Sequence, residues 1–134
     1  MMNLSAEISV GEFLDKVTIL EIKAGRIHDP AKLRNVRNEL DTLRATWQAS
    51  PFSHRDIAAE IARLKRINER LWVIEDDIRL KESQGAFDDE FIQLARSVYI
   101  INDERAAVKR EINLKLGSAL VEEKSYADYR RKEG

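Results

Sequence analysis

Two long helical segments separated by a very short turn constrain this chain more than any other feature of its sequence. Residues 54–84 and 88–116 contain neither proline nor glycine, and their apolar side chains recur every three or four residues. The connection between them is about four residues long, which forces the two helices to run antiparallel. At about 1.5 Å per residue the first helix would span about 46 Å, more than the width of a compact domain of this mass. The sequence therefore predicts an all-α fold, an elongated antiparallel bundle of four main helices dominated by this hairpin.

Two further helices are predicted before the hairpin. Ser9 and Glu12 have the spacing of a capping box, so the first helix begins at Ser9 and runs to about residue 27. Its apolar residues lie almost all the way round it, which is typical of a helix that is central or lies in a dimer interface. Asp29 as N-cap and Pro30 at the first helical position start the second helix, which runs to about residue 47. Its apolar residues form a narrow stripe of the coiled-coil type: Leu33, Val36, Leu40, Leu43 and Trp47.

Capping residues also delimit the hairpin. Ser53, followed three residues later by an aspartate, is the expected cap of the third helix, and Asp88 caps the fourth. Gly117 is expected to end the fourth helix in the left-handed conformation. The remaining tail is predicted to form a short fifth helix or an irregular segment, with residues 127–134 frayed. A chain of 134 residues fits a single helical domain, residues 1–134.

Composition excludes several classes of protein. Charged residues make up 35% of the chain, which suits long helices with one wet face, but the net charge is only −1. Bulk charge therefore implies neither nucleic acid nor a membrane surface as partner. The absence of cysteine excludes a disulfide framework and thiolate catalysis, and it fits a cytoplasmic protein. We expect no signal peptide and no membrane span, since the chain has neither a basic start followed by an apolar run nor 18 consecutive apolar residues.

Polar residues interrupt the apolar arcs of the hairpin on one side. When each residue is placed at about 100° per step, the polar and aromatic residues of both hairpin helices fall at matching offsets from the shared seam. In an antiparallel pair, matching offsets lie on the same flank. A glutamate within the main apolar arc of the first helix, which is expected to cover this flank, joins them. The candidate groove consists of Glu21, Asn68, Trp72, Glu75, Arg79, Tyr99, Asn102, Arg105, Lys109 and Asn113.

Two interpretations of this groove remain open. Unpaired burial of such groups would cost several kcal/mol each, so they must be bonded to one another, solvated or bound to a ligand. In the structural interpretation they form an ion-pair network, with Glu75 pairing with Arg79 and Glu60 reaching Lys109 across the hairpin. In the functional interpretation Arg105, Lys109 and the asparagines hold a small anionic ligand.

Other chemistries are disfavoured. The acidic run at residues 75–77 lacks the i, i+3 partners with which facing helices hold Mg²⁺, and Glu12 and Asp15, which have that spacing, suit the positive end of a helix. We therefore predict no metal and no cofactor. The two histidines lie beside helix breaks, far apart in sequence, and no serine-nucleophile or phosphate-loop motif is present, so the catalytic residues are unknown. The arginine stripes of the second and third helices are interleaved with acids, as on solvated faces, and make nucleic acid an unlikely partner.

Several long segments resemble a small bacterial family known only as a domain of unknown function. They are "ISVGEFLDKVTILEIKAGRI", "KLRNVRNEL", "LWVIEDDIR" and "FIQLARSVYIINDERAAVKREINLKLGSALVEEKSY", and together they cover the chain from about residue 8 to residue 126. The resemblance implies a bacterial, cytoplasmic, stand-alone domain and carries no activity with it. Most residues of the candidate groove fall within these segments.

Two functional hypotheses follow. The first is a helical interaction or scaffold protein that self-associates, as a dimer, through the hairpin or the stripe of the second helix. The second is a protein that binds a small anionic ligand in the groove, or an enzyme that acts on one without a metal. Whether the protein is an enzyme is left open at this stage.

Overall fold

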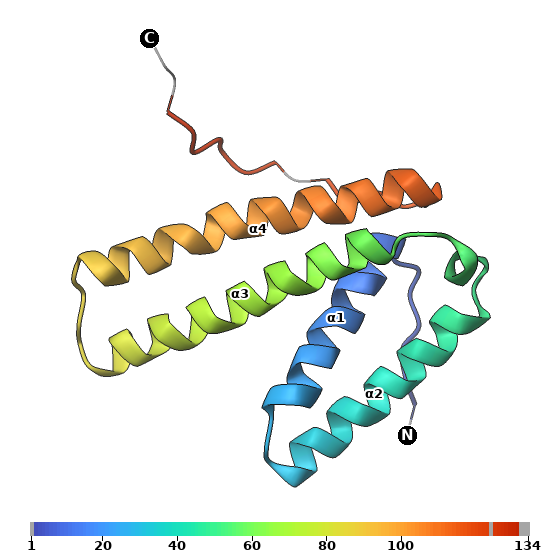
Figure 1. The fold of residues 1–134 in the computed structure, drawn as a ribbon, viewed down its shortest axis with the longest axis horizontal. Helices are drawn as coiled ribbons and strands as arrows, with labels where there is room; N and C mark the ends of the chain where they lie inside the picture. The colour runs from blue at the N-terminus through green and yellow to red at the C-terminus, as the bar shows by residue number, and fades with distance from the viewer. Residues whose placement is uncertain (1, 124, 132–134) are drawn as a thin grey trace.

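The computed structural model describes residues 2–123 and 125–131, and it confirms the all-helical fold. Four α-helices follow one another: α1 (Val10–Arg26), α2 (Pro30–Ala49), α3 (Ala58–Ser83) and α4 (Asp89–Leu116). A short 3₁₀ helix, η1 (Pro51–His54), precedes α3, and the described residues contain no strand. Figure 1 shows α3 and α4 as a long antiparallel hairpin, with α1 and α2 forming a second pair that crosses it at one end. No helix in the described residues has the length and apolar character needed to cross a membrane.

The predicted caps position the helices. Ser9 accepts a hydrogen bond from the backbone N–H of Glu12 at 3.1 Å, and Asp29 accepts one from Lys32 at 2.9 Å. Asp88 accepts one from Phe91 at 3.0 Å, which starts α4 one residue later. Because these side chains satisfy N–H groups that a helix leaves unpaired, the starts of three helices follow from local sequence.

The end of α4 also follows from local sequence. Gly117 adopts the left-handed conformation, with φ of 67°, and its N–H bonds the carbonyl of Asn113. The described part of the tail after this point contains no helix, so the short fifth helix considered above is not found there. Residues 124 and 132–134, which belong to that predicted tail, lie outside the described residues.

The predicted start of α3 is wrong. The helix begins at Ala58 rather than at residue 54, because residues 51–54 form the 3₁₀ turn. Ser53, the expected cap, instead donates its hydroxyl to the carbonyl of Ser50 at 2.9 Å. The residue at the N-cap position is Ile57, which is buried in the core and makes no capping bond. Burial of this side chain, rather than a polar cap, sets the start of α3.

Helix α1 is the centre of the fold. It packs against α2, α3 and α4, in agreement with its apolar residues on nearly all sides. A second apolar cluster joins α1 to α2 around Val17, Leu20 and Leu40. The stripe of α2 therefore faces α1 of the same chain, and Trp47 stacks on Phe13 with ring centroids 6.2 Å apart. The main core lies between α1, α3 and α4 and contains Val10, Leu14, Ile57, Leu64, Ile67, Ile101, Val108, Ile112 and Leu116.

The far half of the hairpin extends beyond this core. We call residues 71–100 the arm; it comprises the end of α3, the turn and the beginning of α4. No residue of the arm is buried, although Leu71 and Ile74 contact the edge of the main core. In Figure 1 the turn end of the hairpin projects past α1 and α2, which leave it uncovered. About half of the long hairpin inferred from the sequence thus contributes to the core, and the other half projects beyond it.

Candidate functional site

A buried carboxylate on α1 organises the polar flank of the hairpin. Asp15 is only 1% exposed, and its two oxygens accept both the Nε and Nη2 groups of Arg105 from α4. Asn68 of α3 donates to the same carboxylate at 2.9 Å and to the hydroxyl of Thr18 at 3.0 Å. The bonds to Asp15 raise the pKa of Arg105, although burial opposes the charge. Three helices are therefore joined by one hydrogen-bonded ion pair.

A second ion-pair group lies one turn further along α4. Lys109 is almost fully buried, and its Nζ contacts Glu12 of α1 at 2.5 Å and Glu122 of the tail at 2.8 Å. Burial opposes the positive charge of Lys109, but the two carboxylates outweigh it and raise the pKa of this amine. The hydrogen bond from Lys109 in turn holds the pKa of Glu122 below its ordinary value. Both cations proposed as ligand-binding groups are therefore already paired with carboxylates.

Helices α1 and α4 approach each other most closely at Gly11. A β-carbon added there would lie 2.5 Å from the carbonyl oxygen of Lys109, so only glycine fits. The N–H of Gly11 donates to Oδ1 of Asn113 at 2.7 Å. The Nδ2 group of Asn113, at a residue that is 1% exposed, has no hydrogen-bond partner within residues 2–123 and 125–131. The crossing thus fixes the orientation of Asn113 and leaves a buried donor unpaired.

Two pockets adjoin Arg105 and its ion pair. We call the first the arm cleft; it lies between the second half of α1 and the arm and has a volume of about 570 Å³. Its walls combine apolar groups, namely Ile19, Ile22, Leu71 and Trp72, with polar ones, namely Lys23, Asn68, Glu75, Asp76, Arg79, Asn102 and Arg105. Arg79 and Glu75 form an exposed pair at 3.6 Å.

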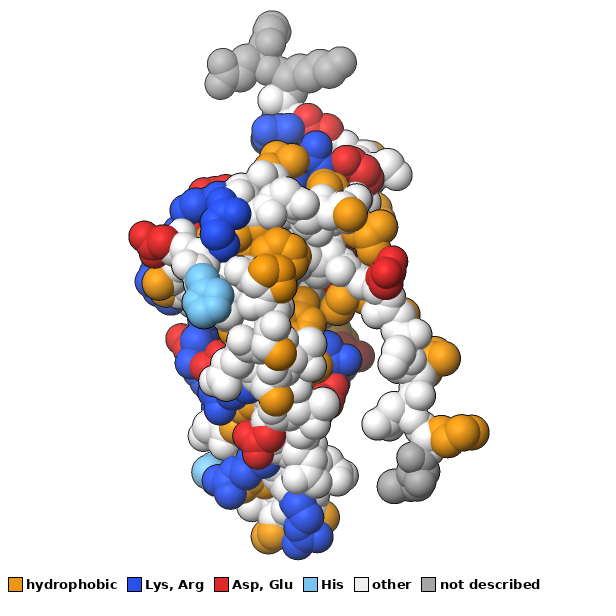
Figure 2. All heavy atoms as spheres, turned by 90° about the vertical axis from the view of Figure 1, so that its right-hand side faces the viewer, with side chains coloured by type: hydrophobic (Ala, Val, Ile, Leu, Met, Phe, Trp, Pro, Cys, Tyr) orange, Lys and Arg blue, Asp and Glu red, His pale blue; other side chains and the backbone are white. Residues whose placement is uncertain are grey.

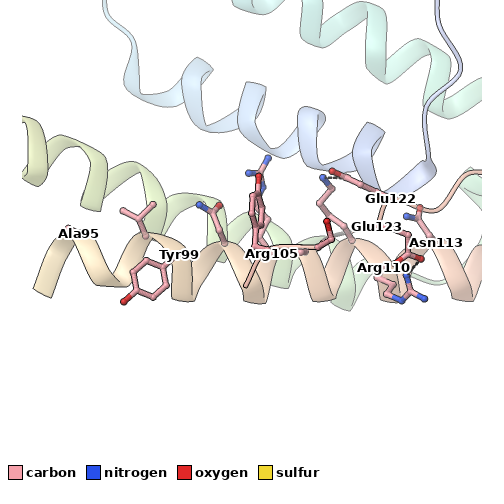
Figure 3. Close-up of a pocket in the computed structure, with 13 residues that line it drawn as sticks. Ala95, Tyr99, Arg105, Arg110, Asn113, Glu122 and Glu123 are labelled. Carbon is pink, nitrogen blue, oxygen red and sulfur yellow. Dashed lines mark hydrogen bonds and ion pairs between the residues drawn. The ribbon is translucent and has the colours of Figure 1, made fainter. Parts of the chain in front are cut away.

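We call the second the tail pocket, since α4 and the tail after residue 121 line it. Its volume is about 680 Å³, and Asn102 and Arg105 border both pockets. Figure 3 shows Arg105 reaching from α4 toward α1, with Tyr99 at one end of the tail pocket and Asn113 at the other. Tail carboxylates lie against the cations of α4, Glu122 on Lys109 and Glu123 on Arg110 at 2.7 Å.

All but one of the ten sequence-derived groove residues line these two pockets, rather than the single groove expected from the sequence. Those of α3 and Asn102 line the arm cleft, and those of α4 line the tail pocket. Glu21 lines neither, because it faces the other side of α1 and pairs with Arg44 at 3.6 Å and Lys65 at 3.3 Å. The expected Glu60–Lys109 pair is wrong, since Glu60 bonds Lys115 at 2.8 Å.

Sequence reasoning missed the centre of the network, Asp15. It assigned Asp15 and Glu12 to the helix N-terminus, where acids favour the helix dipole. A signal was present, however, since a helix that is apolar almost all round is central, and acidic side chains on it are then drawn toward the core. The same reasoning applies to Thr18, which is fully buried beside it.

Ordinary ion pairs cover the opposite flank of the hairpin. Arg63 pairs with Glu111 at 3.0 Å, and Arg70 pairs with Glu104 at 3.1 Å. These pairs fit the antiparallel direction of α3 and α4, and they account for two arginines of the basic stripe on α3. Figure 2, a view of the end of the molecule away from the arm, shows basic and acidic side chains interspersed over that face. In the described part of the chain no group of three or more metal-binding residues is brought together.

The fold and its central network define an all-helical bundle with a projecting two-helix arm. Residues 4–130 match the Family of unknown function (DUF6165), so the chain belongs to that family. No curated protein and no solved structure matches the chain.

Proposed function

We propose that this protein is a helical interaction protein that self-associates through its arm. Two exposed triplets of the arm carry this proposal. On α3, Val73 and Leu80 flank Asp77, and on α4, Ile92 and Tyr99 flank Arg96. Both triplets have the spacing i, i+4, i+7, which places each on one face of its helix.

The two triplets are complementary. Their apolar members are 42% to 58% exposed: Val73, Leu80, Ile92 and Tyr99. Asp77 and Arg96 make no ion pair or hydrogen bond through their side chains within residues 2–123 and 125–131. If the α3 triplet of one copy packs on the α4 triplet of another, apolar side chains meet apolar ones and Asp77 meets Arg96. This opposite charge favours α3 against α4 over pairings of like helices.

The expected association is weak. Covering a half-exposed apolar side chain contributes about 1 kcal/mol, so the four side chains of one contact contribute about 4 kcal/mol. The loss of translational and rotational freedom costs at least about 4 kcal/mol, so a stable complex needs a repeated contact. Two contacts would leave at most about 4 kcal/mol, so we expect a dissociation constant of about 1 mM. For such a protein we propose a cytoplasmic setting, because a chain without cysteine does not depend on an oxidising compartment.

Sedimentation equilibrium with charge-reversal variants tests this function. We expect the average mass of the wild type to rise above that of the monomer between micromolar and millimolar concentrations. Arg96→Glu and Asp77→Lys should each remain monomeric, while their mixture should associate, since each restores the charge that the other lacks. Leu114→Glu is the matched control, because Leu114 is 62% exposed on α4 but lies outside the arm. A monomeric wild type up to millimolar concentration would refute the proposal, and so would a mixture that fails to associate.

The second candidate function is the binding of a small anionic ligand, and one observation favours it. Asn113 holds a buried amide donor without an acceptor at the edge of the tail pocket. The arrangement offers a place for an anion but no set of groups to which a catalytic step can be assigned. We therefore treat this candidate as binding rather than catalysis.

A further inference from the structure

The unpaired side-chain amide of Asn113 borders the tail pocket. Two other donors of this pocket, Lys109 and Arg110, already bind carboxylates. The Oδ1 of Asn113 is held by the N–H of Gly11, so exchanging the oxygen and nitrogen of the side chain would set two donors against each other at 2.7 Å. A buried donor without a partner costs about 1–3 kcal/mol, so an acceptor at this place would be bound favourably.

The neighbouring groups favour an anionic acceptor. Lys109 lies one turn before Asn113 on the same face of α4 and is almost fully buried. The N-terminal end of α1 also lies here, since the N–H groups of Val10 and Gly11 point to Ser118 and Asn113. The positive end of the α1 dipole therefore adds to the charge of Lys109.

A carboxylate of the tail, that of Glu122, already occupies the position beside Lys109. Of the two partners of Lys109, Glu12 belongs to α1, whereas Glu122 lies in an irregular segment and has a side chain that is 59% exposed. Its neighbour Glu123 pairs with Arg110, and both side chains of that pair are about half-exposed or more. The Arg110–Glu123 pair is a surface pair and contributes at most about 1 kcal/mol. Because the side chain of Glu122 is itself largely exposed, another carboxylate can take the place of either tail residue.

Removal of the tail carboxylates changes the charge of the pocket. Arg105 and Lys109 would keep Asp15 and Glu12 as partners, and the charge of Arg110 would be left unpaired. The tail pocket has room for a small molecule, about 680 Å³, with Val98 and Tyr99 as apolar walls.

We propose that the tail pocket is a binding site for a ligand with two carboxylates, in which Glu122 and Glu123 act as displaceable occupants. One ligand carboxylate takes the place of Glu122, where it accepts from Lys109 and from Nδ2 of Asn113. The other takes the place of Glu123 on Arg110. The inference deepens the second candidate function. Its polar groups Lys109, Arg110 and Asn113 lie outside the arm, whereas the apolar wall Tyr99 also belongs to the α4 triplet of the arm.

Binding to the full chain with Glu122→Gln and Glu123→Gln tests the site. The two substitutions lie outside the helices and remove the competing carboxylates without shortening the chain. The probes are succinate, glutarate and the capped peptide Leu-Val-Glu-Glu, which copies residues 120–123. Binding of each is followed by the NMR signals of the Asn113 side-chain amide and, in every variant, of the backbone N–H groups of Lys109 and Arg110. We expect the double variant to bind at least one probe about tenfold more tightly than the wild type, with a downfield shift of the amide protons.

Two further substitutions distinguish specific binding in the tail pocket from a general effect of surface charge. In the double variant, Asn113→Asp keeps the acceptor for Gly11 but removes the donor and should weaken binding at least about tenfold. Gln93→Glu makes the same amide-to-acid change at an exposed position of α4 outside the pocket and should leave binding unchanged.

The outcomes also identify the ligand. Binding of the diacids alone assigns the site to small molecules, and binding of the peptide alone assigns it to acidic protein segments. The absence of binding by all three probes up to about 10 mM would overturn the proposal, since that concentration detects interactions of about −2.7 kcal/mol. Equal effects of Asn113→Asp and Gln93→Glu would also overturn it. Lys109 and Asn113 lie outside the arm, so a monomeric protein that still binds a probe would separate this proposal from self-association.

Discussion

Replacing Arg105 by methionine should destabilise the protein strongly. The substitution leaves the carboxylate of Asp15 in place, 1% exposed, with two of its three side-chain hydrogen bonds removed. Removal of one partner of a buried ion pair costs about 3–5 kcal/mol, because the other charge stays buried without compensation. The side chain of Arg105 is 29% exposed, so water can reach the vacated space and the lower end of that range applies. We expect a loss of about 3 kcal/mol.

Urea unfolding followed by circular dichroism measures this loss. With an unfolding slope of about 2 kcal/mol per molar urea, the midpoint should fall by about 1.5 M. Arg70→Met is the matched control, since Arg70 pairs with Glu104 on the exposed flank and should cost less than about 1 kcal/mol. Asp15→Asn combined with Arg105→Met should cost less than the sum of the two single changes, by about 2 kcal/mol. An Arg105→Met protein as stable as Arg70→Met would refute the assignment of a buried ion pair that holds α1 on α4.

Two further predictions concern the crossing of α1 and α4. Gly11→Ala should destabilise the protein by about 1–3 kcal/mol, because the new methyl group collides with a backbone carbonyl. Gly25→Ala, in the same helix with nothing within 4 Å, should instead stabilise it by about 0.5 kcal/mol, and thermal unfolding compares the two. The contact of the tail with Lys109 should depend on pH in both directions. Because the pKa of Glu122 is lowered, its contribution is present above the ordinary value of 4.5 and is lost as the pH falls through the lower folded value. Because the pKa of Lys109 is raised, its contribution is complete below 10.5 and is lost as the pH rises through the higher folded value. Amide relaxation of residues 120–123 should therefore report release of the tail in strong acid and in strong base, and an unchanged tail in acid would contradict the pairing.

Local patterns explain how much of this fold the sequence predicts. Capping side chains at Ser9, Asp29 and Asp88 and the glycine at position 117 act within a few residues of the chain, so the corresponding helix ends follow directly. The start of α3 does not, because it depends on where Ile57 packs against distant residues. Tertiary burial there outweighs the polar pattern that predicted an earlier start.

The candidate site shows the same division. The shared flank of Asn68, Asn102 and Arg105 follows from helical spacing and the antiparallel turn. The partners of those residues do not, since Asp15 reaches them from a helix whose crossing angle no local pattern sets. The tail carboxylates are also unpredictable, as an irregular segment places them on α4.

Intermolecular distances between arms test the central claim, self-association through the arm, most directly. The chain has no cysteine, so a single Gln84→Cys substitution at the end of α3 introduces one spin label in the arm, and Arg37→Cys on α2 provides the matched label outside it. Arms about 20 Å long that pack side by side should give a discrete distance of about 20–40 Å between labels at position 84, measured by pulsed electron resonance at millimolar protein. Labels at position 37 should give longer or broader distances. The absence of any dipolar coupling between labels at position 84, or a shorter distance at position 37, would contradict the proposed role of the arm.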